Sequence, residues 1–96
     1  MHGTGLDLPR RIARHYDLPL QVSSFLALLI LSEIITDQSV LSLGQVDART
    51  MAYKLRRGLK DSNIEIRSRR AVGYWLDHDT RRELAKQFNI ELGVSV

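Results

Sequence analysis

The amino-acid sequence predicts one mainly α-helical domain that carries a small β-hairpin. Its 96 residues are the length of a single domain. The 44% of hydrophobic residues suffice for one core, which argues against global disorder. Apolar residues recur at helical spacing over most of the chain, whereas residues 64–69 show the period of two that is typical of half-buried strands.

The N-terminal region, residues 1–19, is expected to hold a loose tail and one short helix. Met1–Asp7 contains two glycines and few apolar residues, which is typical of an unstructured terminus. In Leu8–Tyr16 apolar side chains repeat every four residues, and Pro9 suits the first turn of a helix. The helix is expected to end before Pro19, because a residue that precedes proline disfavours the α conformation.

The strongest helical pattern spans Gln21–Ile35. Its side chains are apolar nearly all round, so other elements are expected to surround this helix. The apolar run Phe25–Ile35 is far shorter than the roughly 20 residues that a membrane-spanning helix requires. The polar start of the chain also lacks the apolar segment of a secretory signal. We therefore expect a soluble, cytoplasmic protein with no membrane partner.

Two shorter helices are expected next, joined by a tight turn. Asp37 is a good N-cap for a helix over Asp37–Leu43, and Gly44 stands where a glycine often ends a helix. Asp47 is a good N-cap for a helix over Asp47–Lys60, the third helix of the region that follows residue 19. A short helix, a glycine-containing turn and a second helix are the layout of a helix-turn-helix motif. The apolar stripe of the third helix predicts packing on the core and consists of Ala48, Met51, Ala52, Leu55 and Leu59.

A β-hairpin and a last helix complete the predicted domain, which spans residues 20–89. Ile64–Arg69 alternates as a strand does, residues 70–73 form the turn, and Tyr74–Leu76 returns. Asp79 is predicted to cap a helix over Thr80–Phe88. The expected core comprises Phe25, Leu28, Leu29, Ile35, Leu55, Leu59, Ile66, Tyr74 and Leu76.

The C-terminal tail, residues 90–96, carries apolar residues at alternate positions. Ile90, Leu92, Val94 and Val96 are separated by polar residues and glycine. An edge strand that pairs with another chain has this pattern, so the tail suggests a homodimer or a cooperative pair on DNA.

Positive charge is concentrated in the second half of the chain. Between residues 49 and 70 there are eight Lys and Arg residues against two acidic residues. One face of the third helix carries cations and an aromatic ring without any acid, whereas solvated helix faces usually mix both signs. This face consists of Arg49, Tyr53, Arg56, Arg57 and Lys60, with Thr50 and Lys54 at its border.

This charge pattern predicts a sequence-specific double-stranded DNA-binding protein, such as a transcriptional regulator. In a helix-turn-helix motif the second helix enters the major groove, and its N-terminal residues reach the bases. Arginine is well suited to phosphate contacts on the hairpin and in the last turns of the helix. We expect one continuous basic surface. Its base-contacting residues are Arg49, Thr50, Tyr53 and Lys54; its phosphate contacts are Arg56, Arg57 and Lys60; and its hairpin contacts to the adjacent groove or phosphates are Arg67, Arg69 and Arg70.

The same region resembles the winged-helix DNA-binding (effector) domain of OmpR/PhoB-type bacterial response regulators. The match rests on Leu55-Arg56-Arg57-Gly58-Leu59, on Ile64 and Ile66, and on Arg70-Ala71-Val72-Gly73-Tyr74-Trp75-Leu76, where Ala71 replaces the family's first hairpin glycine. It is best over residues 47–77 and looser over 20–46. The resemblance implies a winged helix-turn-helix fold from a bacterium or phage, here without a receiver domain. It also implies DNA contacts by Arg56 and Arg57 of the recognition helix and by Arg70 of the wing.

Other functions remain open from the sequence. Winged helices also serve as protein–protein docking or dimerisation modules, and the apolar tail fits an interface. Binding of single-stranded nucleic acid requires several exposed aromatic rings, for which Tyr53 and Trp75 are the candidates. A salt titration of duplex binding separates these classes, because only a DNA-binding protein loses affinity steeply with salt.

The sequence offers no pattern that predicts an enzyme, a cofactor or a metal site. There is no cysteine, which excludes disulfides, thiolate catalysis and cysteine-ligated zinc. His2, His15 and His78 are too scattered for a zinc motif. Asp77-His78-Asp79 is better explained as the start of the last helix. No glycine-rich phosphate loop, HExxH or nucleophile elbow is present.

Overall fold

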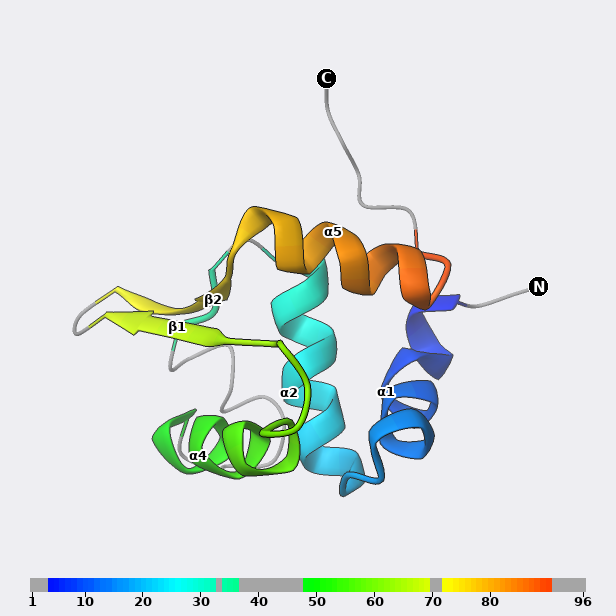
Figure 1. Cartoon of the computed structure of the whole chain (residues 1–96), viewed down its shortest axis with the longest axis horizontal. Helices are drawn as coiled ribbons and strands as arrows, with labels where there is room; N and C mark the ends of the chain where they lie inside the picture. Colours follow the sequence, from blue (N-terminus) through cyan, green and yellow to red (C-terminus); the bar gives the residue numbers. More distant parts are fainter. Residues whose placement is uncertain (1–3, 33, 37–47, 70–71, 91–96) are drawn as a thin grey trace.

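Two helices, α1 and α2, pack side by side and provide the largest helix–helix contact (Figure 1). The structure is a computed structural model that describes residues 4–32, 34–36, 48–69 and 72–90. Within these ranges it holds four helices and a two-stranded antiparallel sheet, which confirms the mainly α-helical class with a small hairpin. The predictions for the helix Asp37–Leu43, the Gly44 turn, Arg70 and residues 91–96 lie outside the described part of the chain.

Helix α1 spans Thr4–Tyr16 and therefore begins before the expected Leu8. Pro9 lies inside the helix and not in its first turn. Leu8 and Ile12 are fully buried, so the predicted apolar repeat does face the core. The helix ends where expected: Asp17 adopts a left-handed φ of 57°, and the Leu18 amide donates to the Ala13 carbonyl at 3.0 Å. Aspartate tolerates this conformation better than most residues do.

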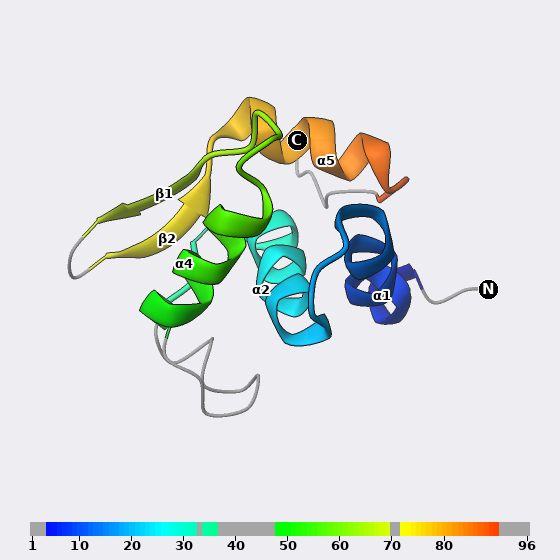
Figure 2. The same cartoon turned by 60° about the horizontal axis from the view of Figure 1, so that its bottom comes forward.

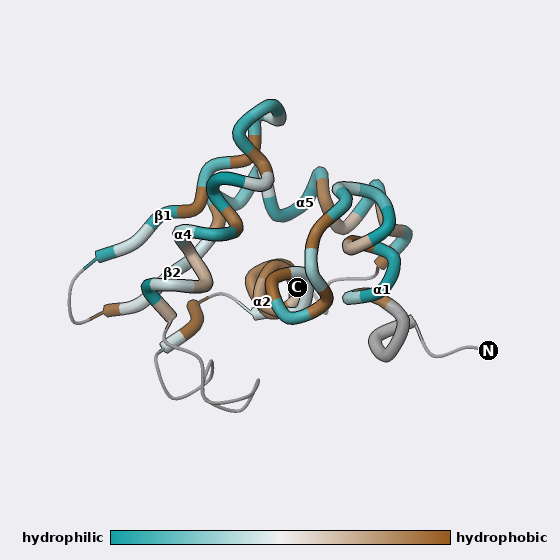
Figure 3. Tube along the Cα trace, turned by 90° about the horizontal axis from the view of Figure 1, so that it is seen from below, coloured by the Kyte–Doolittle hydropathy of each residue, from teal (hydrophilic) through white to brown (hydrophobic). Residues whose placement is uncertain are grey.

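Helix α2 spans Leu20–Leu31 and forms the centre of the molecule. Figures 1 to 3 show it between α1 on one side and α4 on the other, and in Figure 3 it is the most hydrophobic helix. The hydroxyl of buried Ser23 donates to the Pro19 carbonyl at 3.0 Å, so this polar group is satisfied inside the core. No helix in the described part of the chain is long and apolar enough to cross a membrane.

The prediction that this helix continues to Ile35 is wrong. The chain becomes extended at Ser32, with φ −120° and ψ 150°. Ile35 instead forms an antiparallel bridge with Tyr74, in which each amide donates to the other residue's carbonyl at 2.8 and 2.9 Å. Two adjacent β-branched residues, Ile34 and Ile35, favour this extended conformation once a strand is available to pair with it.

Helix α4 spans Ala48–Gly58 and packs against α2. Its expected apolar stripe is confirmed, because Ala48, Met51, Ala52, Leu55 and Leu59 are all buried. At Gly58 a Cβ would collide with the side chain of Leu18, so α4 approaches the connection between α1 and α2 closely. After the helix, the Ser62 hydroxyl donates to the Leu59 carbonyl at 2.7 Å.

The hairpin consists of β1, Ile66–Arg69, and β2, Gly73–Leu76. The two strands pair antiparallel, with Ile66 opposite Leu76 and Arg67 opposite Trp75. Gly73 has a φ of 135°, and a Cβ there would collide with the Ile35 carbonyl oxygen. Glycine at this position therefore lets β2 pair with Ile35 on the side opposite β1.

Helix α5 spans His78–Gln87, so it starts earlier than the expected Thr80. Asp77, not Asp79, occupies the N-cap position, and its side chain makes no capping hydrogen bond. The Asp77 carboxylate binds an arginine of β1 instead, and Asp79 lies in the first turn. Arg81 donates to the Ile30 carbonyl at 2.8 Å and so satisfies a group near the C-terminal end of α2.

The core prediction holds with two adjustments. Leu28 and Tyr74 are half-buried and pack at the edge of the core. The Tyr74 ring meets Phe25 edge-on, with ring centroids 5.9 Å apart. The other predicted core residues are buried: Phe25, Leu29, Ile35, Leu55, Leu59, Ile66 and Leu76.

Candidate functional site

Helix α4 has a buried face on α2 and an exposed cationic face opposite it. The sequence from Ala48 to Lys60 contains no acidic residue, so no carboxylate within the helix neutralises these cations. Its buried apolar stripe holds the helix against the core, and the cations project from a supported surface. The residues on this α4 face are Arg49, Thr50, Tyr53, Lys54, Arg56 and Arg57, with Lys60 two residues after the end of the helix, and all are exposed.

An aromatic–arginine pair lies in the middle of the α4 face. Tyr53 is 58% exposed, although it is a large ring. The Arg57 guanidinium donates to the Tyr53 hydroxyl at 3.4 Å and lies 5.8 Å from the ring centroid. Residues four apart are neighbours on a helix, and a guanidinium at this distance is attracted to the ring's electron density. The pair holds an aromatic surface and a cation together toward solvent.

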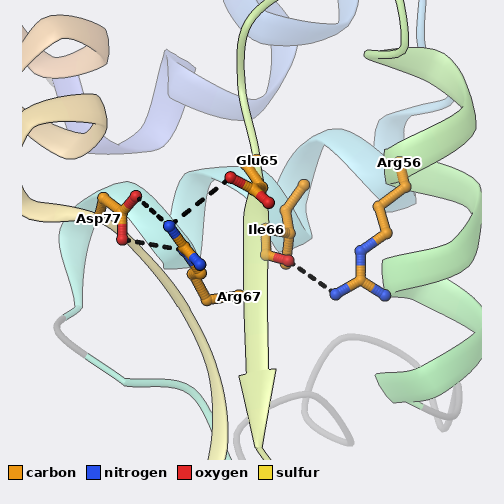
Figure 4. Close-up of polar contacts among 5 residues, drawn as sticks. All are labelled: Arg56, Glu65, Ile66, Arg67 and Asp77. Carbon is orange, nitrogen blue, oxygen red and sulfur yellow. Dashed lines mark hydrogen bonds and ion pairs between the residues drawn. The ribbon is translucent and has the colours of Figure 1, made fainter.

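Arg56 belongs to the α4 face but is directed toward the hairpin. Its Nη2 donates to the Ile66 carbonyl oxygen at 2.7 Å and to the Ser68 hydroxyl at 3.3 Å. Figure 4 shows this side chain reaching across from α4 to β1. The structure therefore uses Arg56 in an internal contact, which the sequence pattern did not indicate.

Arg67 projects from the other side of β1, away from α4 (Figure 4). Its Nε and Nη2 each donate to one oxygen of Asp77 at 3.1 Å, and Nη2 lies 3.7 Å from the Glu65 carboxylate. The hydrogen bonds to Asp77, together with the charges of Asp77 and Glu65, raise the pKa of Arg67 above its already high ordinary value. Arg67 therefore stays charged, but two carboxylates offset that charge.

The structure thus divides the expected continuous surface. It gathers Arg49, Tyr53, Lys54 and Arg57 on α4, and Arg56 joins them to β1. It places Arg67 on the opposite strand face, with exposed Arg69 two residues further on and half-buried Trp75 across the strand pair.

Sequence reasoning missed the carboxylates that bind Arg67. The sequence does indicate these contacts once the pairing register of β1 and β2 is known. Arg67 lies opposite Trp75, so Asp77 is its diagonal neighbour on the same face of the sheet. Glu65 precedes Arg67 by two residues and shares that face.

An open groove lies elsewhere on the molecule, where the end of α1 meets the loop before β1 and one face of α5. Its volume is about 420 Å³. Two carboxylates, Asp79 and Glu83, line it, so it does not extend the cationic surface. No cluster of metal-ligating side chains occurs in the described ranges. The other residues that line the groove are Tyr16, Ser62, Asn63, Ile64, Thr80, Leu84 and Gln87.

Comparison with known proteins adds no relative: no family model, no curated protein and no solved structure matches the chain.

Proposed function

We propose that this protein is a sequence-specific double-stranded DNA-binding protein of the winged helix-turn-helix type, with α4 as its recognition helix and the β1–β2 hairpin as its wing. The observation that carries the proposal is the α4 face. It combines exposed cations with an exposed tyrosine, contains no acid, and lies on a helix whose opposite side is anchored in the core. The major groove of DNA is wide enough for one α-helix, and the phosphates along the groove attract a cationic helix face.

The order of elements supports the same proposal. Among the described elements, the central helix α2 is followed by the extended residue Ile35, then by α4 and, after a short turn, by the hairpin. The hairpin extends from the helical body beside α4 in Figures 1 and 2. A duplex that receives α4 in its groove would therefore meet the hairpin next to it.

Within the α4 face the positions suggest a division of roles. Arg49, Thr50 and Tyr53 lie in the first half of the helix, which in helix-turn-helix proteins meets the base edges. Arg57 and Lys60 lie at its end, where phosphate contacts position the helix without reading sequence. Lys54 lies between the two groups.

The test is a salt titration of duplex binding with two charge-matched variants. One variant replaces three cations of the α4 face, Arg49→Gln, Lys54→Gln and Arg57→Gln. The other removes the same charge from exposed positions on α1 and α5, Arg10→Gln, Arg14→Gln and Lys86→Gln. Fluorescence anisotropy with a labelled duplex gives the slope of log K against log salt for each protein.

We expect the α4 variant to lower the slope by about 0.9 to 1.8, because each lost phosphate contact removes about 0.9 and Arg49 is assigned to base edges. The control variant should keep the wild-type slope. Equal losses in both variants would indicate a non-specific polyanion surface. A wild-type protein that does not bind duplex at low salt would exclude DNA binding and favour a protein docking module.

A further inference from the structure

We infer that Arg56 is a positioning residue, which fixes the hairpin against α4 and makes no phosphate contact of its own. The inferred effect on DNA binding rests on the proposed function. The inferred contact between Arg56 and the hairpin concerns the protein without DNA. It departs from the role that the sequence pattern indicates, since Arg56 lies among the cations of the α4 face.

The geometry of Arg56 differs from that of its neighbour Arg57. The Arg57 guanidinium stays on its own helix, beside the Tyr53 ring. The Arg56 guanidinium leaves its helix and donates to two acceptors on β1, the Ile66 carbonyl at 2.7 Å and the Ser68 hydroxyl at 3.3 Å. One acceptor is a backbone carbonyl, which points sideways from the strand, and the other is a side-chain hydroxyl two residues further on. The guanidinium therefore lies along the side of β1 that faces α4, as Figure 4 shows for Ile66.

The position of β1 explains why such a donor is needed. In the described sheet β2 lies between β1 and Ile35, so β1 is the edge strand on the α4 side. Edge strands leave backbone carbonyls without a strand partner. A charged donor makes a hydrogen bond roughly twice as strong as a neutral one. Arg56 thus supplies the hydrogen-bond donor that a neighbouring strand would otherwise supply to the outer edge of β1.

The hairpin is consequently held at both edges. On the β2 side it is held by the two backbone hydrogen bonds to Ile35 and by the packing of Tyr74 on Phe25. On the β1 side it is held by Arg56. When a duplex binds α4, the angle between α4 and the hairpin decides whether both elements reach it together. Arg56 sets this angle before binding, which spares the complex the entropy of ordering the hairpin.

The experiment compares Arg56→Ala with Arg57→Ala, an adjacent and equally charged control. Both residues are exposed, and a thermal melt confirms that each variant is folded. Two quantities are measured on each protein: the amide hydrogen-exchange rates of β1 and β2 without DNA, and the salt slope of binding to a duplex.

We expect Arg56→Ala to accelerate exchange in the hairpin about tenfold, since it removes one charge-assisted hydrogen bond from the edge strand. Its duplex affinity should fall several-fold while the salt slope stays at the wild-type value. Arg57→Ala should leave hairpin exchange unchanged and lower the slope by about 0.9. Arg56→Lys should restore part of the exchange protection, because an ammonium can donate to the Ile66 carbonyl.

Two results would overturn the inference. If Arg56→Ala lowers the salt slope by about 0.9 and leaves hairpin exchange unchanged, Arg56 is a phosphate contact. If exchange accelerates equally in both alanine variants, the effect is a general loss of stability. Failure of the proposed function is distinguishable from both, because wild-type protein would then show no duplex binding while the exchange comparison still decides whether Arg56 holds the hairpin.

Discussion

The exposed faces of α4 and β1 both carry arginine, but their charges have different surroundings. On α4 the segment from Ala48 to Lys60 holds five cations and no acid. On β1 Arg67 lies between Asp77 and Glu65 and is one positive charge against two negative ones. A phosphate that approaches β1 from this side meets carboxylates as well as a guanidinium. The comparison teaches that the count of basic residues overstates the charge that the hairpin offers.

The largest effect is expected beneath the α4 face. Leu55 is fully buried between α4 and the core. Leu55→Ala should lower the free energy of unfolding by about 2–5 kcal/mol, because it removes buried methyl groups and leaves a cavity. Denaturant melts measure this loss, with exposed Lys54→Ala as the control on the other face. A loss below about 0.5 kcal/mol would mean that α4 is not anchored as described.

The hairpin depends on Gly73 in a comparable way. Gly73→Ala forces an unfavourable φ and drives a Cβ against the Ile35 carbonyl, so it should cost about 1–3 kcal/mol of stability. Gly58→Ala is the comparison, because Gly58 has an ordinary helical backbone and its new Cβ displaces a side-chain methyl of Leu18, whereas the Cβ at Gly73 meets backbone. Thermal melts compare the two variants. Equal destabilisation of the two variants would contradict the conclusion that the close contact between Gly73 and the Ile35 carbonyl requires glycine.

The contrast between the two faces is tested directly in DNA binding. Arg49→Ala should cost about 1–3 kcal/mol on a preferred duplex and less on random DNA, since it removes a base contact. Arg67→Ala should lower affinity only several-fold at low salt, and equally on both duplexes, because it removes one peripheral charge and no base contact. Competition binding against specific and random duplexes measures both. Equal losses for the two variants on both duplexes would remove the distinction between α4 and β1.

The smallest effect should have the opposite sign. Asp77→Asn removes one carboxylate from Arg67 and lowers the repulsion of phosphates near β1. Affinity for any duplex should rise about threefold at low salt, and the gain should vanish at high salt, as is typical of a peripheral charge. Asp17→Asn is the control, as an exposed acid at the end of α1 whose left-handed backbone asparagine also tolerates. An unchanged affinity would place β1 outside the contact area.

Local patterns predicted the helices and the hairpin because burial on one side dictates spacing. The stripe from Ala48 to Leu59 is an example, since helical geometry alone places these residues on one face. The end of α2 was not predictable in this way. Ile34 and Ile35 are as apolar as the helix before them. The strand that pairs with Ile35 is β2, which is distant in the sequence. Tertiary pairing there overrides the local pattern.

The candidate site shows the same limit for polar side chains. Helical periodicity correctly gathered Arg49, Tyr53 and Arg57 on one exposed face. It gave no indication that Arg56 donates to a carbonyl ten residues away, because a long flexible side chain chooses among all nearby acceptors. Asp77 was expected to help start α5, but a bidentate contact with Arg67 competes with the capping hydrogen bond.

The bridge between Ile35 and Tyr74 also shapes how the chain tolerates insertions. Its two hydrogen bonds fix the ends of one long segment, which contains the whole of α4 and β1, next to each other. The entropy of closing such a segment grows only with the logarithm of its length, by about 0.6 kcal/mol for each doubling. Extra residues beside exposed Asp61 or Asn63, in the turn between α4 and β1, would therefore cost a small fraction of the folding free energy. This turn is thus a place where related sequences can differ in length while the bridge and α4 keep their positions on the core.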